Sequence, residues 1–108
     1  MADRARIRAP DHVVDLVRSL HPELKRKIRA AIDDILADPE IGKALRDDLM
    51  GLRSLRVGRM RIIYQSSSSQ IDLVAVGPRT TIYEETARML ARSAPSSPER
   101  RRRGKRQK

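Results

Sequence analysis

Three arginines and one tyrosine are the side chains of this sequence best suited to act together. Arg56, Arg61, Arg79 and Tyr83 follow one another along a short stretch of the chain, with a single carboxylate, Asp72, among them. Arginine binds phosphate through a planar fork of permanently charged donors, and a tyrosine hydroxyl can donate, accept or lose a proton. These residue types therefore predict a site for a phosphate or another anion.

The spacing of the first two arginines adds to this prediction. Gly58 and Arg59 are typical of a two-residue hairpin loop with glycine at its first position, which places Arg56 directly opposite Arg61. Two like charges opposite each other normally destabilise a sheet. An anion held between the two guanidinium groups would offset that cost.

Hydrophobic periodicity predicts the sheet that carries these residues. Residues 53–57, 60–65 and 71–77 alternate with a period of two, as the strands of an antiparallel meander do. One face is expected to pack on helices, and we interpret Tyr64 there as a core residue. That face carries Leu55, Val57, Met60, Ile62 and Tyr64. The opposite face is left open, and it carries the arginines.

The N-terminal half predicts a short strand and two helices. Residues 5–9 alternate and stop at Pro10, as a short edge strand does. Apolar residues then recur at helical spacing in two segments. We expect Asp11 to cap the first helix, and the second helix to begin at Pro22 and end before Asp38. A tight connection between them indicates two antiparallel helices.

A third helix is predicted after the last strand. Thr81 and Glu84 have the spacing of a capping box, and the helix would continue to about Arg92. Tyr83 then lies in the first turn of this helix. Backbone amides and the helix dipole attract phosphate there.

The charge of the chain points to an anionic partner. Its 108 residues leave room for one domain, and its net charge is +10. Nucleic acid, an anionic membrane or an acidic protein would suit such a charge. Seven basic side chains and one carboxylate lie in residues 93–108. We therefore expect a disordered basic tail there, after a domain formed by residues 1–92.

What the sequence lacks excludes several classes of protein. Without cysteine there are no disulfides and no thiol catalysis. The histidines and carboxylates are scattered, so we expect no metal and no cofactor. No apolar run approaches the ~18 residues of a membrane helix, and the N-terminus lacks an apolar signal core. We expect a soluble, cytoplasmic protein without membrane contact.

Several segments resemble the RelE/ParE superfamily of bacterial and archaeal toxins. The resemblance is carried by residues 52–65 and 76–83, and residues 20–28 and 36–40 are similar to the helical hairpin of that superfamily. It covers about residues 4–91. It implies an α+β fold in which an N-terminal short strand and a helical hairpin pack on a twisted antiparallel sheet, followed by a short C-terminal helix.

The resemblance also implies an activity, which is cleavage of mRNA in the A site of the 70S ribosome by a metal-free endoribonuclease. A cognate antitoxin, a small protein encoded nearby, would hold the enzyme inactive. The catalytic positions fall on Arg56, Arg61, Arg79 and Tyr83. By this analogy the tyrosine helps to activate the ribose 2′-hydroxyl and Arg61 stabilises the pentacovalent phosphate. Arg79 assists the leaving oxygen, and Arg56 holds the RNA backbone.

Two nearby arginines and one departure complete this interpretation. Arg53 and Arg59 are expected to bind RNA. RelE itself has a lysine two residues before the position of Arg56, and this chain has Ser54 there. Without that lysine, the rate and the role of Arg56 are open.

Other functions stay open as well. A ParE-like member would share the fold but poison DNA gyrase, and it would not need the catalytic set. A catalytically inactive basic binding module is a third alternative, which the serine at position 54 favours. Retention of Arg61, Arg79 and Tyr83 favours the ribonuclease. Arg61 could instead pair with Asp72 across the sheet.

Overall fold

The computed structural model describes residues 6–93. The predicted basic tail lies outside the described residues from residue 94 on. Along the described chain the elements are β1 (Arg6–Arg8), α1 (Asp11–Ser19), α2 (Pro22–Ala37), β2 (Lys43–Ala44), the 3₁₀ helix η1 (Asp47–Leu49), β3 (Arg53–Val57), β4 (Met60–Ser67), β5 (Gln70–Pro78) and α3 (Ile82–Ser93). None of the helices within residues 6–93 combines the length and apolarity needed to cross a membrane.

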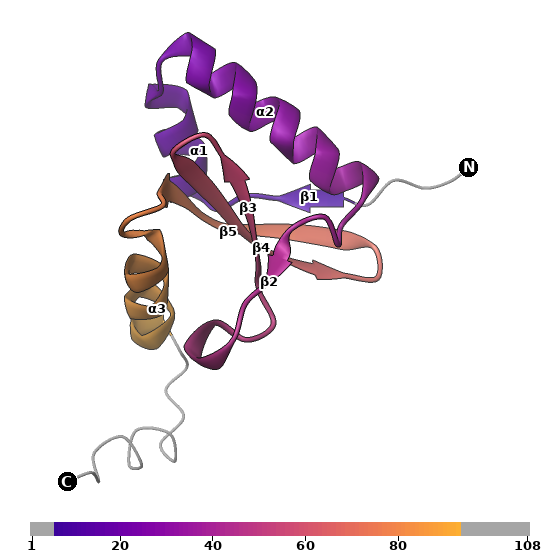
Figure 1. Ribbon diagram of the computed structural model, residues 1–108, viewed down its shortest axis with the longest axis vertical. Helices are drawn as coiled ribbons and strands as arrows, with labels where there is room; N and C mark the ends of the chain where they lie inside the picture. The colour runs from indigo at the N-terminus through magenta and orange to yellow at the C-terminus, as the bar shows by residue number, and fades with distance from the viewer. Residues whose placement is uncertain (1–5, 94–108) are drawn as a thin grey trace, which may run out of the picture.

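The strands form one sheet in the order β1-β5-β4-β3-β2 (Figure 1). The predicted meander of β3, β4 and β5 is confirmed, and Arg56 pairs with Arg61 as expected. Gly58 opens the loop between β3 and β4 with a φ of 63°, a left-handed conformation that glycine adopts without strain. The sheet is not wholly antiparallel, however, because β1 pairs in parallel with β5 along Arg6–Arg8.

Each face of the sheet carries a hydrophobic core. Helices α1 and α2 cover one face, with Ile28, Ile35, Ile62 and Tyr64 at its centre. On the other face, a smaller core joins α3 and η1 to β4 and β5; its buried members are Leu49, Leu52, Ile63, Ala75 and Ile82. Figure 1 shows α2 and α3 on opposite sides of the sheet. The face predicted to be open is therefore partly covered, because α3 folds back against it.

A register shift between β4 and β5 changes which side chains of β5 face each core. Ile63 pairs with Ala75, but the next residue, Tyr64, pairs with Leu73. Such a bulge adds one residue to a strand and increases the local twist. Ile63 and Ala75 consequently face α3, whereas Tyr64 and Leu73 face the helical hairpin.

The two N-terminal helices begin in different ways. Pro10 occupies the capping position of α1 without a side-chain hydrogen bond, so the predicted cap at Asp11 is wrong. Asp11 is the first helical residue, where its carboxylate still complements the helix dipole. The ring Nδ1 of His21 caps α2 by accepting from the Glu23 amide at 3.1 Å, and Pro22 begins that helix as predicted.

Tyr64 links the sheet to the loop after α2 through two hydrogen bonds. Its side chain is fully buried, which confirms the predicted core position. The hydroxyl donates to the Pro39 carbonyl at 2.7 Å and accepts from the Gly42 amide at 2.9 Å. Burial raises the pKa of Tyr64, although the hydrogen bond from Gly42 and the charge of Arg53 act in the opposite direction.

We expect Tyr64→Phe to lower the free energy of unfolding by about 1–3 kcal/mol, because it leaves a buried amide and a partly buried carbonyl without their partner. The loss should shrink as the pH rises above about 10, where the unfolded wild type releases a phenolic proton that the folded state retains. Urea unfolding of both proteins between about pH 8 and about pH 11 measures the difference. A loss that stays constant over this range would contradict the assigned cause of the pKa shift.

Candidate phosphate-binding and catalytic site

The β3–β4 hairpin and the first turn of α3 bring the predicted residues together. Hairpin register directs Ser54 and Arg61 toward the face that α3 covers. Ile82, only 2% exposed, anchors the start of α3 against that face. A Cβ at Gly77 would lie 2.9 Å from the Ile82 side chain, so glycine allows this close packing. Tyr83, the next residue, is thereby held over β3 and β4.

Three side chains meet at this point. The Tyr83 hydroxyl lies 3.0 Å from Ser54 Oγ, and Arg61 Nη1 donates to the same oxygen at 3.2 Å. The guanidinium carbon of Arg61 lies 5.7 Å from the centre of the Tyr83 ring, within range of a cation–π contact. Ser54 is 2% exposed, whereas Arg61 and Tyr83 are half-buried. Arg61 and Tyr83 thus share one buried hydroxyl as a hydrogen-bond partner.

Arg61 is a partly buried cation without a carboxylate partner among residues 6–93. The alternative pairing with Asp72 is wrong, because Asp72 lies 3.9 Å from Arg8 and accepts a hydrogen bond from Gln70. Arg61 Nε is buried and has no hydrogen-bond partner in the described chain. An unsatisfied buried donor costs about 1–3 kcal/mol of stability. Because Arg61 lowers the stability of the fold in this way, its position favours a role in ligand binding.

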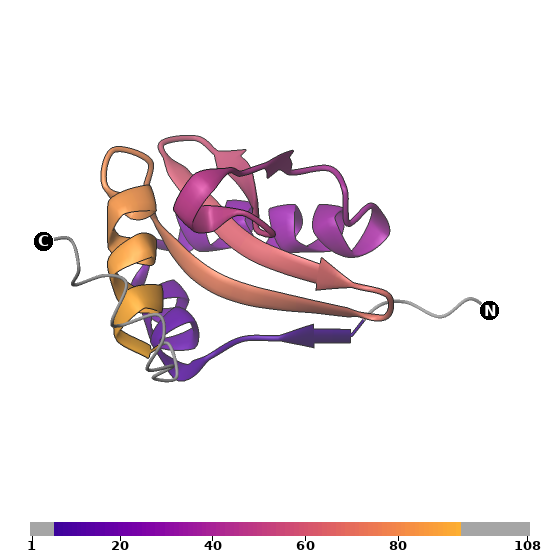
Figure 2. The same ribbon diagram turned by 90° about the horizontal axis from the view of Figure 1, so that it is seen from below.

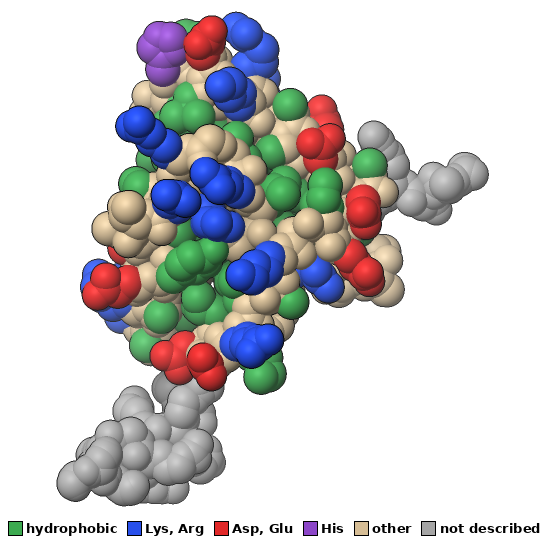
Figure 3. Space-filling view, viewed as in Figure 1, with side chains coloured by type: hydrophobic (Ala, Val, Ile, Leu, Met, Phe, Trp, Pro, Cys, Tyr) green, Lys and Arg blue, Asp and Glu red, His purple; other side chains and the backbone are tan. Residues whose placement is uncertain are grey.

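Exposed arginines surround this centre. Arg56, Arg59 and Arg79 are exposed, and Arg56 Nε donates to the Gly58 carbonyl at 3.2 Å. The Arg79 amide donates to the Arg59 carbonyl at 2.9 Å, which ties the loop before α3 to the hairpin. Figure 2 shows this loop beside the hairpin turn, and Figure 3 shows basic side chains gathered over the same region. The predicted cluster is therefore assembled at one end of the sheet.

Arg53 does not join this cluster. It pairs with Tyr64 across the sheet, and its Nη1 donates to the carbonyls of Gly42 at 2.7 Å and Glu40 at 3.3 Å. A guanidinium held in this way supports the loop after α2. The contacts of Arg53 are therefore with the loop after α2 and not with the cluster.

Sequence reasoning missed the part played by Ser54. Hairpin register already placed it on the same face as Arg61, which was the available signal. Its contact with Tyr83 depends on where α3 packs, and no local pattern encodes that position. Serine is neutral, so positive charge at this site comes from the arginines.

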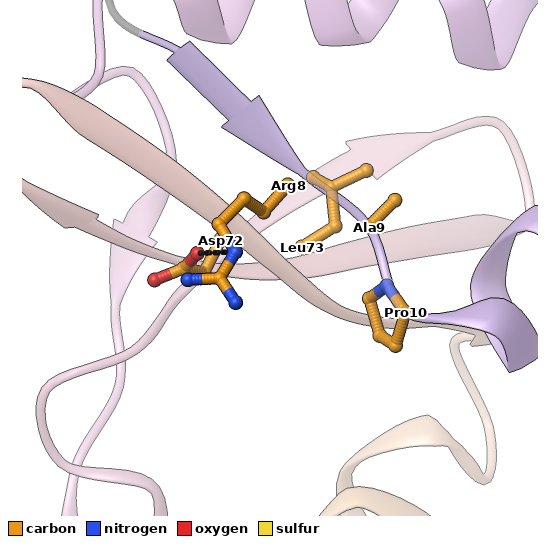
Figure 4. Close-up of a pocket in the computed structure, with 5 residues that line it drawn as sticks. All are labelled: Arg8, Ala9, Pro10, Asp72 and Leu73. Atoms are coloured by element: carbon orange, nitrogen blue, oxygen red, sulfur yellow. Dashed lines mark ion pairs between the residues drawn. The ribbon is translucent and has the colours of Figure 1, made fainter.

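A cleft of about 420 Å³ lies elsewhere, at the edge between β1 and β5 (Figure 4). It is lined by Arg8, Ala9, Pro10, Asp72 and Leu73. Asp72 pairs with Gln65 near one end of β5, whereas Arg61 pairs with Gly77 near the other end. The cleft holds none of the predicted catalytic residues. Within residues 6–93, no three His, Asp or Glu side chains converge as a metal site would require.

Solved structures with this fold include toxins. The toxin–antitoxin complex RelBE2 from Mycobacterium tuberculosis has a TM-score of 0.64 and 23% identity, over 71% of this chain and 100% of that chain. A mutant of the E. coli toxin RelE in the free state has a TM-score of 0.65 and 17% identity, over 82% and 99% of the two chains. For the archaeal RelE–RelB complex from Pyrococcus horikoshii the values are 0.58 and 24%, over 71% and 97%. The predicted α+β, RelE-like fold is confirmed.

Comparison of the sequence with known protein families identifies the family of this chain. Residues 2–83 match the family described as the ParE toxin of the type II toxin–antitoxin system parDE. The chain belongs to this family, and its predicted place in the RelE/ParE superfamily is confirmed. It is the toxin component of a type II toxin–antitoxin system. No curated protein sequence matches the chain at a significant level.

Replacing Arg61 and Arg53 separately should distinguish a functional arginine from a structural one. We expect Arg61→Met to leave the free energy of unfolding unchanged within about 0.5 kcal/mol or to raise it, because it removes an unsatisfied buried donor. Arg53→Met should lower it by about 1.5–3 kcal/mol, because two carbonyls lose a charged donor. Urea unfolding measures both changes. An equal loss in the two variants would make Arg61 a structural residue.

Proposed function

We propose that this toxin is an endoribonuclease that cleaves mRNA in the A site of the 70S ribosome, without a metal or other cofactor, and so stops translation. The observation that carries the proposal is the contact of Tyr83 and Arg61 through Ser54, within a rim of exposed arginines. Arginines can bind the RNA phosphates, and tyrosine can transfer a proton. Acting on ribosomes, the toxin would work in the cytoplasm.

The proposed reaction is a transfer within the RNA strand. Tyr83 accepts the proton of the ribose 2′-hydroxyl while its own phenolic proton passes to water, and the 2′-oxygen attacks the adjacent phosphorus. The bond from phosphorus to the 5′-oxygen breaks, and that oxygen takes a proton from water with the help of Arg79. The products are a 2′,3′-cyclic phosphate and a 5′-hydroxyl. Arg61 stabilises the added negative charge on the pentacovalent phosphate, and Arg56 holds the backbone.

Much of the rate enhancement in this mechanism must come from the positioning of the RNA. Neither arginine nor an ordinary tyrosine titrates near neutral pH, so little of the catalysis can come from a base that is already deprotonated. Electrostatic stabilisation and alignment of the reacting oxygen with phosphorus must supply the rest. A ribosome that holds the mRNA in place would provide this alignment, which is why we propose a ribosome-bound substrate.

A cognate antitoxin completes the proposal. The family is that of toxins in toxin–antitoxin pairs, and similar solved structures are complexes of RelE with RelB and of YoeB with YefM. For this chain we propose a small, acidic antitoxin encoded next to the toxin. Acidic side chains would complement the basic rim at Arg56, Arg59 and Arg79.

Inhibition of DNA gyrase is the second candidate function. The match of residues 2–83 to the ParE family favours it, since ParE-like toxins poison gyrase and need no catalytic set. The paired Arg61 and Tyr83 favour the ribonuclease, because gyrase binding does not require this arrangement. A basic module that binds without catalysis would explain the exposed arginines but not the half-buried Arg61 beside Tyr83.

Cleavage of mRNA on programmed ribosomes tests the proposed function. Wild-type toxin should produce new mRNA ends, and Arg61→Ala and Tyr83→Phe should each lower the cleavage rate by about 100-fold or more, because each removes an interaction with the reacting groups. Arg29→Ala, which removes an exposed arginine from α2, is the matched control and should cleave like wild type. Primer extension on the mRNA measures the rates.

The same proteins distinguish the second candidate. Intact mRNA with the wild type, together with gyrase-dependent breaks in supercoiled DNA, would replace the ribonuclease by a gyrase inhibitor. Equal cleavage by wild type, Arg61→Ala and Tyr83→Phe would contradict the site assignment even if RNA is cut.

A further inference from the structure

Ser54 is the buried hydroxyl through which the two reactive side chains contact each other. Its Oγ accepts a hydrogen bond from Arg61 Nη1 at 3.2 Å and lies 3.0 Å from the Tyr83 hydroxyl. The residue is 2% exposed, so solvent cannot substitute for either contact. Strand β3 lies between β2 and β4, with Ser54 paired to Lys43 and Ile63. Its oxygen is therefore held by an interior strand.

Hydrogen-bonding capacity fixes the direction of these contacts. Arg61 can only donate, so Ser54 must accept from it. The hydrogen of Ser54 then needs an acceptor, and the Tyr83 oxygen is the one within reach. If Tyr83 donated instead, the hydrogen of Ser54 would be buried without a partner among the described residues, at a cost of about 1–3 kcal/mol. The favoured order is Arg61 to Ser54 to Tyr83.

This direction has a chemical consequence for Tyr83. With Ser54 donating to its oxygen, the phenolic hydrogen points away from Ser54. After that hydrogen has left, the same bond stabilises the negative oxygen, because hydrogen bonds to a charged acceptor are about twice as strong as neutral ones. The positive charge of Arg61 polarises the Ser54 hydroxyl and so reinforces this effect.

We propose that Ser54 is a positioning residue of the cleavage site: it fixes the Tyr83 oxygen relative to Arg61, so that the proton acceptor and the phosphate-binding guanidinium face one scissile phosphodiester. This inference rests on the proposed ribonuclease function and adds a residue to it. Ser54 does not touch the substrate. It acts on the geometry and the charge of Tyr83 through a single buried oxygen.

Removing and restoring the Ser54 hydroxyl tests the proposal in the ribosome assay. Ser54→Ala should lower kcat by about 10–100-fold and leave KM within about 3-fold, because alignment is lost while the exposed arginines still bind RNA. Ser54→Thr, which keeps a hydroxyl, should recover most of kcat. Ser67→Ala, which removes the exposed serine whose hydroxyl donates to the Gln70 carbonyl, should cleave like wild type. An unchanged kcat in Ser54→Ala would overturn the proposal.

A second measurement does not depend on activity. Tyr64 and Tyr83 are the two tyrosines of the chain, so ¹³C-tyrosine labelling yields two sets of ring signals. Ser54→Ala should shift the Tyr83 signals and leave those of Tyr64 in place, and Ser54→Thr should restore the Tyr83 signals. Tyr83 signals that do not respond to Ser54→Ala would overturn the positioning role.

The two results separate this inference from the function on which it rests. A wild-type toxin that leaves mRNA intact contradicts the ribonuclease, and the tyrosine spectra then decide alone whether Ser54 orients Tyr83. A wild type that cleaves, with Ser54→Ala cleaving equally well, contradicts the inference only. If Ser54→Thr is too large for the site and stays inactive, restoration of its Tyr83 signals would still support the proposal, and their failure to return would count against it.

Discussion

The pairing of Arg56 with Arg61 across the β3–β4 hairpin is the constraint on which the site depends. Gly58, with its left-handed backbone, closes the hairpin in two residues and so fixes this register. A slip of one residue would turn Ile62, which is fully buried against the helical hairpin, out of its core and would turn Arg61 toward that core. Burial of Ile62 therefore keeps Arg61 and Ser54 on the face that meets α3. The hydrophobic core thus sets the positions of the chemical groups.

Stability and function are divided between the two faces of the sheet. On the face of α1 and α2, polar groups are satisfied: Tyr64 and Arg53 both bind backbone groups of the loop after α2. On the face of α3, Arg61 is partly buried without a carboxylate partner in the described chain, and like charges oppose each other. An anionic ligand would relieve both costs, which is the physical basis for assigning function to this face.

Local signals explain what could be predicted from the sequence. Strand alternation, the glycine of the hairpin and Pro22 gave the meander, its register and the start of α2, because each depends on neighbouring residues. The parallel pairing of β1, the covering of the second face by α3 and the carbonyl partners of Arg53 depend on distant contacts. Ser54 belongs with these: its register was predictable, but its contact with Tyr83 was not. The resemblance gave the superfamily, whereas the choice between ribonuclease and gyrase inhibitor rests on side-chain geometry.

The central claim is that a tyrosine and an arginine, joined through a serine, direct a ribose hydroxyl onto its own phosphate. Chemical analysis of the RNA ends left by purified toxin on programmed ribosomes tests this claim most directly. A 2′,3′-cyclic phosphate with a 5′-hydroxyl is the predicted result, together with no cleavage where the scissile nucleotide lacks its 2′-hydroxyl. Ends with a 3′-hydroxyl and a 5′-phosphate, or cleavage of the 2′-deoxy substrate, would contradict it.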